Sequence, residues 1–333
     1  MSKKIAVIGD GAWGTALARL LKENGHDVRV WGPFAENVES ANLAHENAAF
    51  LPGVKLPEDL RFHTDPQQAA ADAAVVVLAT PSQFYSEVLD RFEGLIDPQS
   101  LIVSVTKGLD FESRRRMTEI AREKIGAATV AALSGPSFAD EVARGLPTAV
   151  VIACDVLERA ESLQRIFSND YFRAYTSDDV VGTELGGALK NIVAIAAGVS
   201  DGIGYGYNSK AALITRGLAE IKRLGCALGA RPETFAGLSG MGDLMLTCTG
   251  KLSRNRGVGE RLGRGEKIEA ILASMQHVAE GVWNCSIALR SARDCAVEVP
   301  ITEQVNAIVH AGKNPRDAVH SLLARDLKSE LEE

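Results

Sequence analysis

The pattern of hydrophobic and polar positions changes about halfway along the chain. The first half alternates short apolar segments, rich in β-branched residues, with segments of helical periodicity. Most of the apolar segments lack a polar face, which is typical of strands in a largely parallel sheet covered by helices on both sides. We therefore predict a doubly wound α/β fold. Its strands are expected over residues 4–9, 27–32, 61–64, 73–80, 100–108, 129–135, 148–154 and 172–177.

The second half shows helical periodicity and no further strand signal after about residue 178. The change predicts two domains, a mainly parallel α/β domain over residues 1–180 and an all-helical domain over residues 181–333. The glycine-rich stretch 198–208 is predicted to be a loop between two helices, either a plain connector or a lid. The predicted helices cover residues 184–200, 209–229, 232–238, 255–263, 267–275, 278–294 and 301–312.

One predicted helix contains a lysine that its neighbours do not explain. The segment GGALKNIVAIAAG, residues 186–198, has no polar face, so it is predicted to be a buried helix. Burying the isolated ammonium of Lys190 would be costly or would force the group to lose its proton. Either this lysine reaches the surface along its aliphatic stem, or a cleft requires it.

A glycine motif follows the first predicted strand. Gly9, Gly11 and Gly14 form G-x-G-x-x-G at a strand-to-helix turn, the setting in which this motif predicts a dinucleotide site. The first glycine allows the tight turn, the second lets the backbone approach a pyrophosphate, and the third lets helix and strand pack closely. Free N–H groups at the helix start would bind the anion. The first half is therefore predicted to be a Rossmann-type domain.

The end of the second strand does not reveal which dinucleotide binds. Such strands usually end in an acidic residue that binds the ribose 2′-hydroxyl of NAD, or lie near an arginine that binds the 2′-phosphate of NADP. Here the sequence is Trp31-Gly32-Pro33-Phe34, with neither group. The choice between NAD(H) and NADP(H) stays open.

Chemistry-bearing residues also follow other strands. Ligands of open α/β sheets bind beyond the carboxyl ends of the strands. Lys107 is predicted to project there, although a lone lysine in such a loop is often only solvated. Ser137 is predicted to cap a helix, with Asp140 or Glu141 completing a capping box, or to bind a ligand. The strand ends concerned are residues 79–83, 104–109 and 133–141.

The helical half carries two further signals. Ser253, Arg254 and Asn255 stand just before a predicted helix, where a guanidinium and free N–H groups would form a phosphate site. A solvated basic loop would have the same composition. Asp243 is either a turn former or the partner of a buried cation. A buried Lys190 would require such a partner, so the two residues explain each other.

Composition narrows the class of protein. The net charge of −7 argues against a general nucleic-acid or anionic-membrane binder. No apolar run reaches the roughly 20 residues that span a bilayer, and the N-terminus lacks a signal-peptide cleavage pattern. The five cysteines are scattered, which favours free thiols in a reducing compartment and no metal site. We expect a cytoplasmic protein that neither binds nucleic acid nor inserts into a membrane.

A series of motifs resembles one family of enzymes. The order along the chain is GDGAWGTALA, NAAFLPGVKLP, VSVTKGL, LSGPSFA, GGALKN, NSKAALITRGLAE, GMGDL, SRN and VAEG. Together these segments resemble the bacterial NAD(P)-dependent glycerol-3-phosphate dehydrogenases, over about residues 4–312. The resemblance implies a homodimer that needs NAD(P)H and no metal, and that supplies glycerol 3-phosphate for phospholipid synthesis.

The resemblance also implies roles for individual residues. Lys190 would accept the proton in glycerol 3-phosphate oxidation and donate it in dihydroxyacetone phosphate reduction. Pro33 stands where the family often carries Arg or His, which leaves recognition of a 2′-phosphate in doubt. Residues implied to line the substrate, besides Lys190, are Lys107, Gly135, Ser137, Asp243, Ser253, Arg254 and Asn255. Residues implied to contact the dinucleotide, besides Gly9, Gly11 and Gly14, are Ala12, Trp13, Pro33, Lys107, Ala139, Arg254, Val278 and Glu280.

The chemistry of ketone reduction fits a lysine at this position. Hydride transfer builds negative charge on the carbonyl oxygen, which a proton donor must neutralise. Burial and the cation of Lys107 should lower the pKa of Lys190 towards neutrality, while Asp243 should oppose that shift. Two alternatives remain, namely a related β-hydroxyacid or 6-phosphogluconate-type dehydrogenase, and a dinucleotide sensor without catalytic activity.

Overall fold

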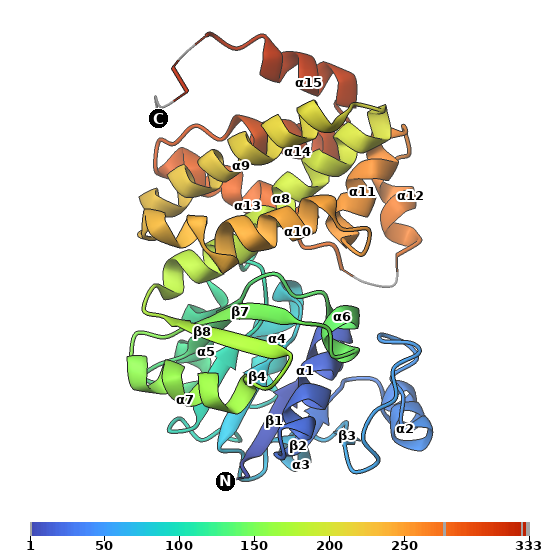
Figure 1. Ribbon diagram of the computed structural model, residues 1–333, viewed down its shortest axis with the longest axis vertical. Coiled ribbons are helices and arrows are strands. Elements are labelled where there is room, and N and C mark those ends of the chain that lie inside the picture. The colour runs from blue at the N-terminus through green and yellow to red at the C-terminus, as the bar shows by residue number, and fades with distance from the viewer. Residues whose placement is uncertain (1, 276–277, 328, 331–333) are drawn as a thin grey trace.

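The computed structural model describes residues 2–275, 278–327 and 329–330. A sheet with its covering helices forms one end of the molecule, and a group of helices forms the other (Figure 1). The long helix α8 (Val180–Ile203) leads from the first part into the second. The predicted order, an α/β region followed by a helical region, is confirmed.

The α/β region is built on one mainly parallel sheet with the strand order β3-β2-β1-β4-β5-β6-β7-β8. Among the strand pairs of the described residues, β6–β7 is antiparallel and the others are parallel. Because β1 lies between β2 and β4, the direction of strand addition reverses there, and ligands of such sheets bind at that reversal, beyond the carboxyl ends. The strands are β1 (Lys4–Ile8), β2 (Asp27–Trp31), β3 (Arg61–His63), β4 (Val75–Leu78), β5 (Leu101–Ser104), β6 (Ala131–Ser134), β7 (Thr148–Ala153) and β8 (Phe172–Ser177).

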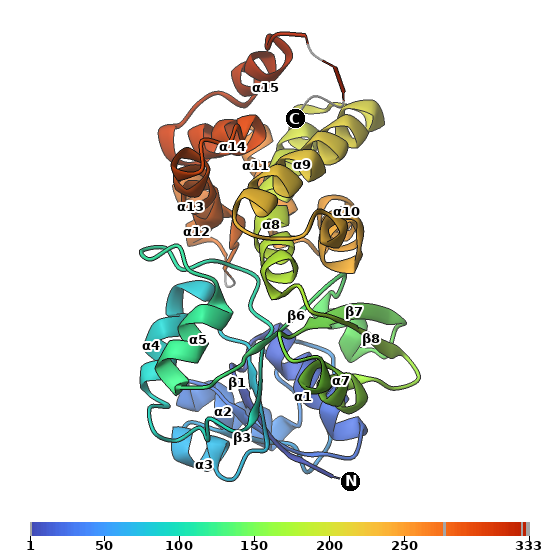
Figure 2. The ribbon, with the colours of Figure 1, turned by 90° about the vertical axis from the view of Figure 1, so that its left-hand side faces the viewer.

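Helices cover both faces of this sheet (Figure 2). The central strand β4 is buried along its whole length, which explains why its sequence VVVL shows no polar face. One face packs against α1 (Ala12–Glu23), α6 (Ala139–Ala143) and α7 (Leu157–Phe167). The other packs against α3 (Pro66–Ala70), α4 (Tyr85–Asp90) and α5 (Met117–Ile125). Helix α2 (Ala35–Ala44) packs beside β3 at the sheet edge.

The helical region is arranged around α8, which α9, α10, α11, α13 and α14 all contact. By length and composition α8 could cross a membrane, but 89% of its most apolar window is buried inside the protein. It is therefore a core helix, as the sequence predicts. The other helices are α9 (Tyr207–Ala227), α10 (Asp243–Thr249), α11 (Arg254–Gly263), α12 (Ile268–Ala273), α13 (Gly281–Asp294), α14 (Pro300–Ala311) and α15 (Pro315–Leu323).

The predicted loop over residues 198–208 is wrong. Residues 198–203 form the last turns of α8, and α9 begins at Tyr207, so the connector is only three residues long. The glycines of this stretch serve packing instead. A Cβ on Gly198 would lie 2.0 Å from the backbone oxygen of Arg256 in α11, and one on Gly202 would lie 2.2 Å from that of Glu260. Glycine here lets α8 and α11 approach closely.

The sequence also missed several short elements. Helices α10 and α15 were not among the predicted ones. The predicted helix over residues 232–238 is a 3-10 turn (Pro232–Ala236), followed by a short π-helical segment (Leu238–Gly242). Part of the predicted helix over residues 278–294 is irregular, because α13 begins only at Gly281. These differences fall where glycine or proline interrupts the periodicity.

Candidate active site

The glycine turn has the shape that a bound dinucleotide requires. Gly9 adopts a φ of +118°, and a Cβ there would lie 2.7 Å from the backbone oxygen of Ala79. A Cβ on Gly14 would lie 2.0 Å from the backbone oxygen of Gly9, so this glycine lets α1 pack on β1. Nothing lies within 4 Å of a Cβ on Gly11. The protein itself does not require glycine at position 11, whereas a closely approaching pyrophosphate would.

The other residues expected near the dinucleotide lie around this turn. Ala12 and Trp13 form the first turn of α1, and the Trp13 indole nitrogen is buried with no hydrogen-bond partner among the described residues. Ala139 begins α6, which packs against α1. Pro33 is exposed just beyond β2. The residues present thus fit a dinucleotide on the turn.

Lys190 is buried and does not reach the surface. Its side chain is only 7% exposed. The Nζ atom lies 2.5 Å from Oδ1 of Asp243 and 2.8 Å from Oγ1 of Thr247, both on α10. Asp243 is 1% exposed, which confirms it as the partner of a buried cation rather than a surface turn former. A buried ammonium is tolerated because it is paired and hydrogen-bonded.

Lys107 contacts the same carboxylate from the other side. Its Nζ lies 2.9 Å from Oδ2 of Asp243 and 2.8 Å from the backbone oxygen of Gly135, which follows β6. A weaker contact of 3.4 Å joins it to the Ser137 hydroxyl. A Cβ on Gly187 in α8 would lie 2.7 Å from the Ser134 hydroxyl oxygen, so glycine lets α8 approach the end of β6 next to Lys107. Asp243 therefore bridges a lysine of the α/β region and a lysine of the helical region.

The environment shifts the pKa of Lys190 to about 7. Burial is the largest cause, because it disfavours the charged ammonium. The carboxylate of Asp243 opposes this shift, and the positive charge of Lys107 adds to it. All three directions agree with the sequence-based expectation. An amine with this pKa exists in both protonation states near neutral pH, as a group that gives and takes protons must.

The predicted capping role of Ser137 is wrong. Helix α6 begins at Ala139 with Phe138 at its N-cap position, and no side chain caps it. The Ser137 hydroxyl instead donates a 2.9 Å hydrogen bond to the backbone oxygen of Gly135. It lies beside Lys107, which donates to the same carbonyl. Ser137 stands one residue before the N-cap position and forms its hydrogen bond within the turn at Gly135, where φ is +134°.

The start of α11 combines a cap, a free cation and a buried amide. Ser253 is the N-cap, and its hydroxyl accepts a hydrogen bond from the Arg256 backbone. Arg254 is exposed and forms no hydrogen bond or ion pair with any residue that the structure describes. The Asn255 carboxamide is already engaged, since it donates to Asn191 at 2.9 Å and accepts from the Gly281 backbone at 2.9 Å.

Glu280 connects this region to the end of β4. Its carboxylate accepts a 3.0 Å hydrogen bond from the Ser82 backbone and another from the Ser82 hydroxyl. Burial raises the pKa of Glu280, against the effects of these bonds and of the Arg254 charge. Val278, two residues earlier, is partly buried. The sequence singled out residues 79–83 as a strand end but did not predict the Ser82 contact.

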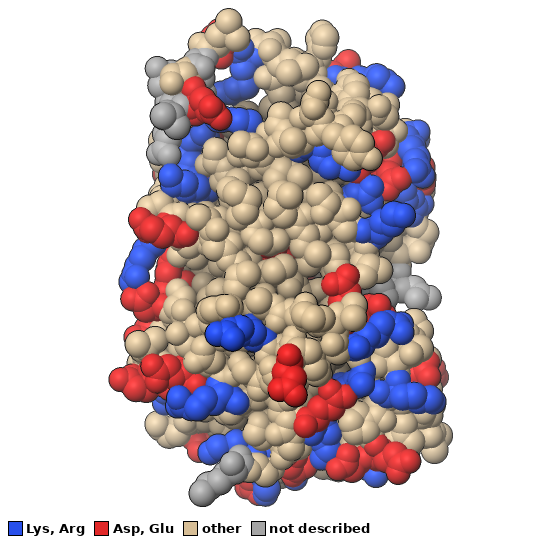
Figure 3. Space-filling model, in the orientation of Figure 1, with Lys and Arg blue, Asp and Glu red and all other residues tan. Residues whose placement is uncertain are grey.

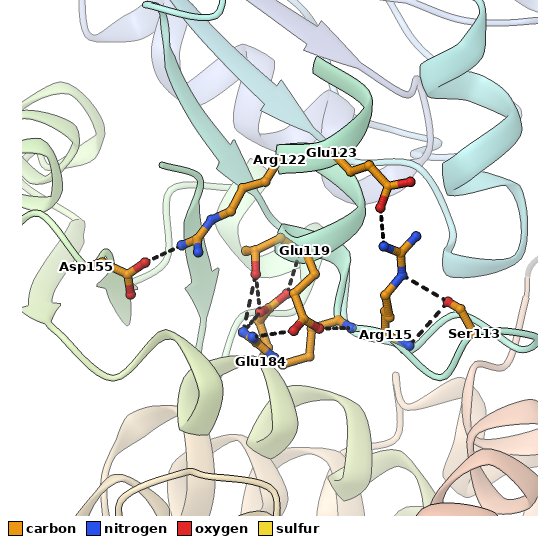
Figure 4. Close-up of polar contacts among 9 residues, drawn as sticks. Ser113, Arg115, Glu119, Arg122, Glu123, Asp155 and Glu184 are labelled. Atoms are coloured by element: carbon orange, nitrogen blue, oxygen red, sulfur yellow. Dashed lines mark hydrogen bonds and ion pairs between the residues drawn. The ribbon is translucent and has the colours of Figure 1, made fainter. Parts of the chain in front are cut away.

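A buried carboxylate fixes the start of α8 on the α/β region. Glu184 accepts hydrogen bonds from the Thr118 backbone at 2.9 Å, the Thr118 hydroxyl at 2.6 Å and the Arg116 guanidinium at 2.8 Å. Figure 4 shows Glu184 beside Glu119 at the start of α5. Two further ion pairs, Arg122–Asp155 and Arg115–Glu123, flank this cluster (Figure 4). Because Lys190 lies less than two turns further along α8, this anchor helps to fix its position.

Other contacts of the site carried no usable sequence signal. Thr247 lies one helical turn after Asp243 and also donates to the Asp243 backbone oxygen at 2.6 Å, but α10 itself was not predicted. Asn191 donates to the backbone oxygen of Lys107 at 3.3 Å. Its position next to Lys190 was visible in the sequence, whereas its partner was not.

Taken together, the turn and the lysine cluster define a class of protein. A turn shaped for a pyrophosphate stands at the reversal point of a doubly wound sheet, and a buried lysine of near-neutral pKa lies on the helix that leaves this sheet. This arrangement is typical of a dinucleotide-dependent dehydrogenase.

Comparison with known proteins identifies the family. The models for the N-terminus and the C-terminus of NAD-dependent glycerol-3-phosphate dehydrogenase match residues 4–160 and 179–320. The chain is 49% identical over 333 residues to a glycerol-3-phosphate dehydrogenase (NAD(P)+) of Geobacter sulfurreducens, covering 99% of both chains. It is 48% identical over 334 residues to that of Geobacillus kaustophilus, covering 99% of this chain and 97% of the other. The chain belongs to the NAD(P)-dependent glycerol-3-phosphate dehydrogenase family.

A solved structure supports the same assignment. The crystal structure of glycerol-3-phosphate dehydrogenase from Coxiella burnetii superposes with a TM-score of 0.94 at 39% identity, covering 97% of this chain and 99% of that one. The predicted resemblance is thereby confirmed. Family membership also decides against the β-hydroxyacid and 6-phosphogluconate alternatives and against a sensor.

Proposed function

We propose that this chain catalyses reversible hydride transfer between NAD(P)H and dihydroxyacetone phosphate, which gives glycerol 3-phosphate, with Lys190 as the general acid and base. The observation that carries the proposal is the buried cluster Lys107–Asp243–Lys190, in which Lys190 has a pKa of about 7. The names of the relatives supply the substrate and the coenzyme.

When bound, the dinucleotide supplies or accepts the hydride. The glycine turn, with Ala12 and Trp13, holds its pyrophosphate at the start of α1. The remaining proposed contacts come from both regions of the chain: Pro33, Lys107, Ala139, Arg254, Val278 and Glu280. We propose a division of labour in which residues 1–180 bind the dinucleotide and residues 181–333 supply the acid–base lysine and most of the substrate site.

Lys190 transfers the proton. As an ammonium it has three N–H groups, and the structure uses two of them, on Asp243 and Thr247. The third donates to the carbonyl oxygen of the substrate and delivers the proton as negative charge develops there. In the oxidation direction the neutral amine takes the proton from the hydroxyl of glycerol 3-phosphate. Asp243 holds the amine in place, and Lys107, Gly135 and Ser137 border the same space.

The start of α11 binds the substrate phosphate. The first N–H groups of a helix have no partner within it, and they favour anions. The guanidinium of Arg254 is free to form charge-assisted hydrogen bonds with phosphate oxygens. Ser253 and Asn255 contribute through the backbone, because the Ser253 hydroxyl caps the helix and the Asn255 carboxamide is engaged elsewhere.

We propose that the protein acts in the cytoplasm, as a homodimer, and that its product glycerol 3-phosphate is used in phospholipid synthesis. A patch with few charged residues lies in the middle of the helical region on the face that shows α9 and α10 (Figure 3). Met245 on α10 is 43% exposed, and Met241 and Leu252 nearby in the chain are 41% and 53% exposed. Sedimentation analysis should give a dimer, and Met245→Lys should shift it towards the monomer. A wild-type monomer at micromolar concentration would contradict this.

A direct spectrophotometric measurement of coenzyme oxidation tests the function. The purified protein is mixed with NADH or NADPH and with one of three ketones: dihydroxyacetone phosphate, the keto form of a β-hydroxyacid, or the ketone formed by oxidation of 6-phosphogluconate. Coenzyme oxidation should require dihydroxyacetone phosphate. Turnover of another ketone in preference to it would overturn the proposal.

A further inference from the structure

Asp10 is a buried acidic residue that the mechanism above does not use. It stands between the first two glycines of the turn and is only 5% exposed. Its backbone oxygen accepts hydrogen bonds from the Thr15 hydroxyl at 3.0 Å and from the Asn47 carboxamide at 2.7 Å, which fix this part of the turn. Its carboxylate, in contrast, forms no ion pair and accepts no hydrogen bond from another residue that the structure describes.

The Asp10 carboxylate lies at the tip of β2. A Cβ built on Gly32 would lie 2.3 Å from Oδ2 and 2.5 Å from Cγ of Asp10. Gly32 directly follows Trp31, the last residue of β2. The carboxylate therefore occupies the space into which a side chain at position 32 would extend, and glycine at that position leaves room for it.

The residue at the end of the second strand has a defined function in dinucleotide-binding sheets. It is commonly Asp or Glu, and its carboxylate accepts a hydrogen bond from the 2′-hydroxyl of the adenosine ribose. This chain has no acidic residue over positions 31–34. The structure instead brings a carboxylate to the same place from the glycine turn.

We propose that Asp10 binds the 2′-hydroxyl of the adenosine ribose and repels a 2′-phosphate, so that the enzyme prefers NAD(H) to NADP(H). The inference rests on the proposed dinucleotide function and names the coenzyme for it. Pro33 and Phe34 offer no cation that would compensate a phosphate beside this carboxylate. Burial raises the pKa of Asp10 to about 6, so the group is ionised at pH 8.

A purely structural role for Asp10 makes a different prediction. A carboxylate that precedes α1 interacts favourably with the positive end of the helix, and it weakens the binding of any pyrophosphate. Both effects are the same for the two coenzymes. Removing the carboxylate would then change the affinities for both by a similar factor, whereas the proposal predicts changes in opposite directions.

The test uses ligands that cannot turn over. Calorimetry at pH 8 measures the dissociation constants of ADP-ribose and of 2′-phospho-ADP-ribose for the full-length protein without substrate. The variants are Asp10→Asn, which keeps the shape of the side chain, and Asp10→Ser, which keeps a small polar group. The control is Asp72→Asn, which removes one negative charge from an exposed carboxylate that pairs with Lys4 at the opposite end of β1.

Wild type and control should bind ADP-ribose more tightly than its 2′-phosphate. Both Asp10 variants should bind ADP-ribose more weakly and 2′-phospho-ADP-ribose more tightly. The ratio of the affinity for ADP-ribose to that for its 2′-phosphate should therefore fall about ten- to a hundredfold. Parallel changes in both affinities, or a wild type without preference, would overturn the inference while leaving the proposed function intact. If neither ligand binds the wild type, both the inference and the proposed function fail.

Discussion

Replacing Lys190 with alanine should lower kcat for dihydroxyacetone phosphate reduction by about 10²–10⁴-fold, the usual contribution of a general acid. The dissociation constant of NADH should change little, because the glycine turn lies in the other region of the chain. The fold should persist, since Asp243 keeps its ion pair with Lys107 at 2.9 Å and is not left as an unpaired buried charge. Steady-state kinetics and a coenzyme titration measure the two effects separately.

Two further variants distinguish proton transfer from general disturbance. Lys210 also lies in the helical region and pairs with Asp201 at 2.6 Å, with a side chain 17% exposed, but it has no role in the proposed mechanism. Lys210→Ala should keep kcat close to the wild-type value. Small alkylamines added to Lys190→Ala should restore part of the activity, because they can occupy the space of the missing amine. Near-normal turnover of Lys190→Ala would remove this lysine from the mechanism.

Replacing Arg254 with alanine should raise KM for dihydroxyacetone phosphate about ten- to a hundredfold, with a smaller change in kcat. Hydrogen bonds to charged groups contribute about 1.5–3 kcal/mol each, and the guanidinium has no partner among the described protein residues that would compete for it. Arg254→Lys should recover only part of the loss, because an ammonium cannot form the planar two-bond contact.

The same helix offers a matched control for this prediction. Arg261 lies two turns further along α11 and is held by Glu266 at 2.6 Å and by Ser274 at 2.7 Å. Arg261→Ala should therefore leave KM unchanged. Dihydroxyacetone without its phosphate should be reduced equally poorly by wild type and by Arg254→Ala. An unchanged KM in Arg254→Ala would place the phosphate site elsewhere.

The strands and the buried lysine were predictable for the same reason. Segments such as VVVL in β4 have no polar face, and only burial on both sides explains this. The same argument placed the helix of Lys190 inside the protein and indicated Asp243, 53 residues away, as the partner that a buried Lys190 would require. Energetic necessity thus predicted a contact that no local pattern contains.

Glycine was the main source of error, because its sequence pattern is the same for different structural roles. In residues 198–208 glycines mark the contact between α8 and α11, where a loop was expected. The glycines before α10 obscured its helical periodicity, so neither this helix nor the contact of Thr247 was predicted. At position 32 glycine was seen as a missing ribose-binding acid, although it makes room for the carboxylate of Asp10. Each role depends on which segment packs against the glycine, and the sequence alone does not contain that information.

The shared carboxylate was also beyond sequence reasoning. Lys107 was expected beyond a strand end and Lys190 on a buried helix, and Asp243 was expected to be either a turn former or the partner of one buried cation. Asp243 binds both lysines because β5, α8 and α10 are placed so that the two amines reach one carboxylate. Such a three-element contact is set by tertiary packing, which here includes the anchor of α8 through Glu184.

The pH dependence of kcat/KM in both directions tests the central claim most directly. Reduction consumes one proton, so the equilibrium constant fixes the difference between the slopes of log(kcat/KM) against pH in the two directions. The pKa of the acid–base group fixes the pH at which each profile changes slope. With the pKa of Lys190 at about 7, reduction should be constant below that pH and fall above it. Oxidation should rise up to the same pH and then level off, because it needs the neutral amine. The account predicts that this shared bend disappears in Lys190→Ala; a bend that persists unchanged in the variant would contradict it.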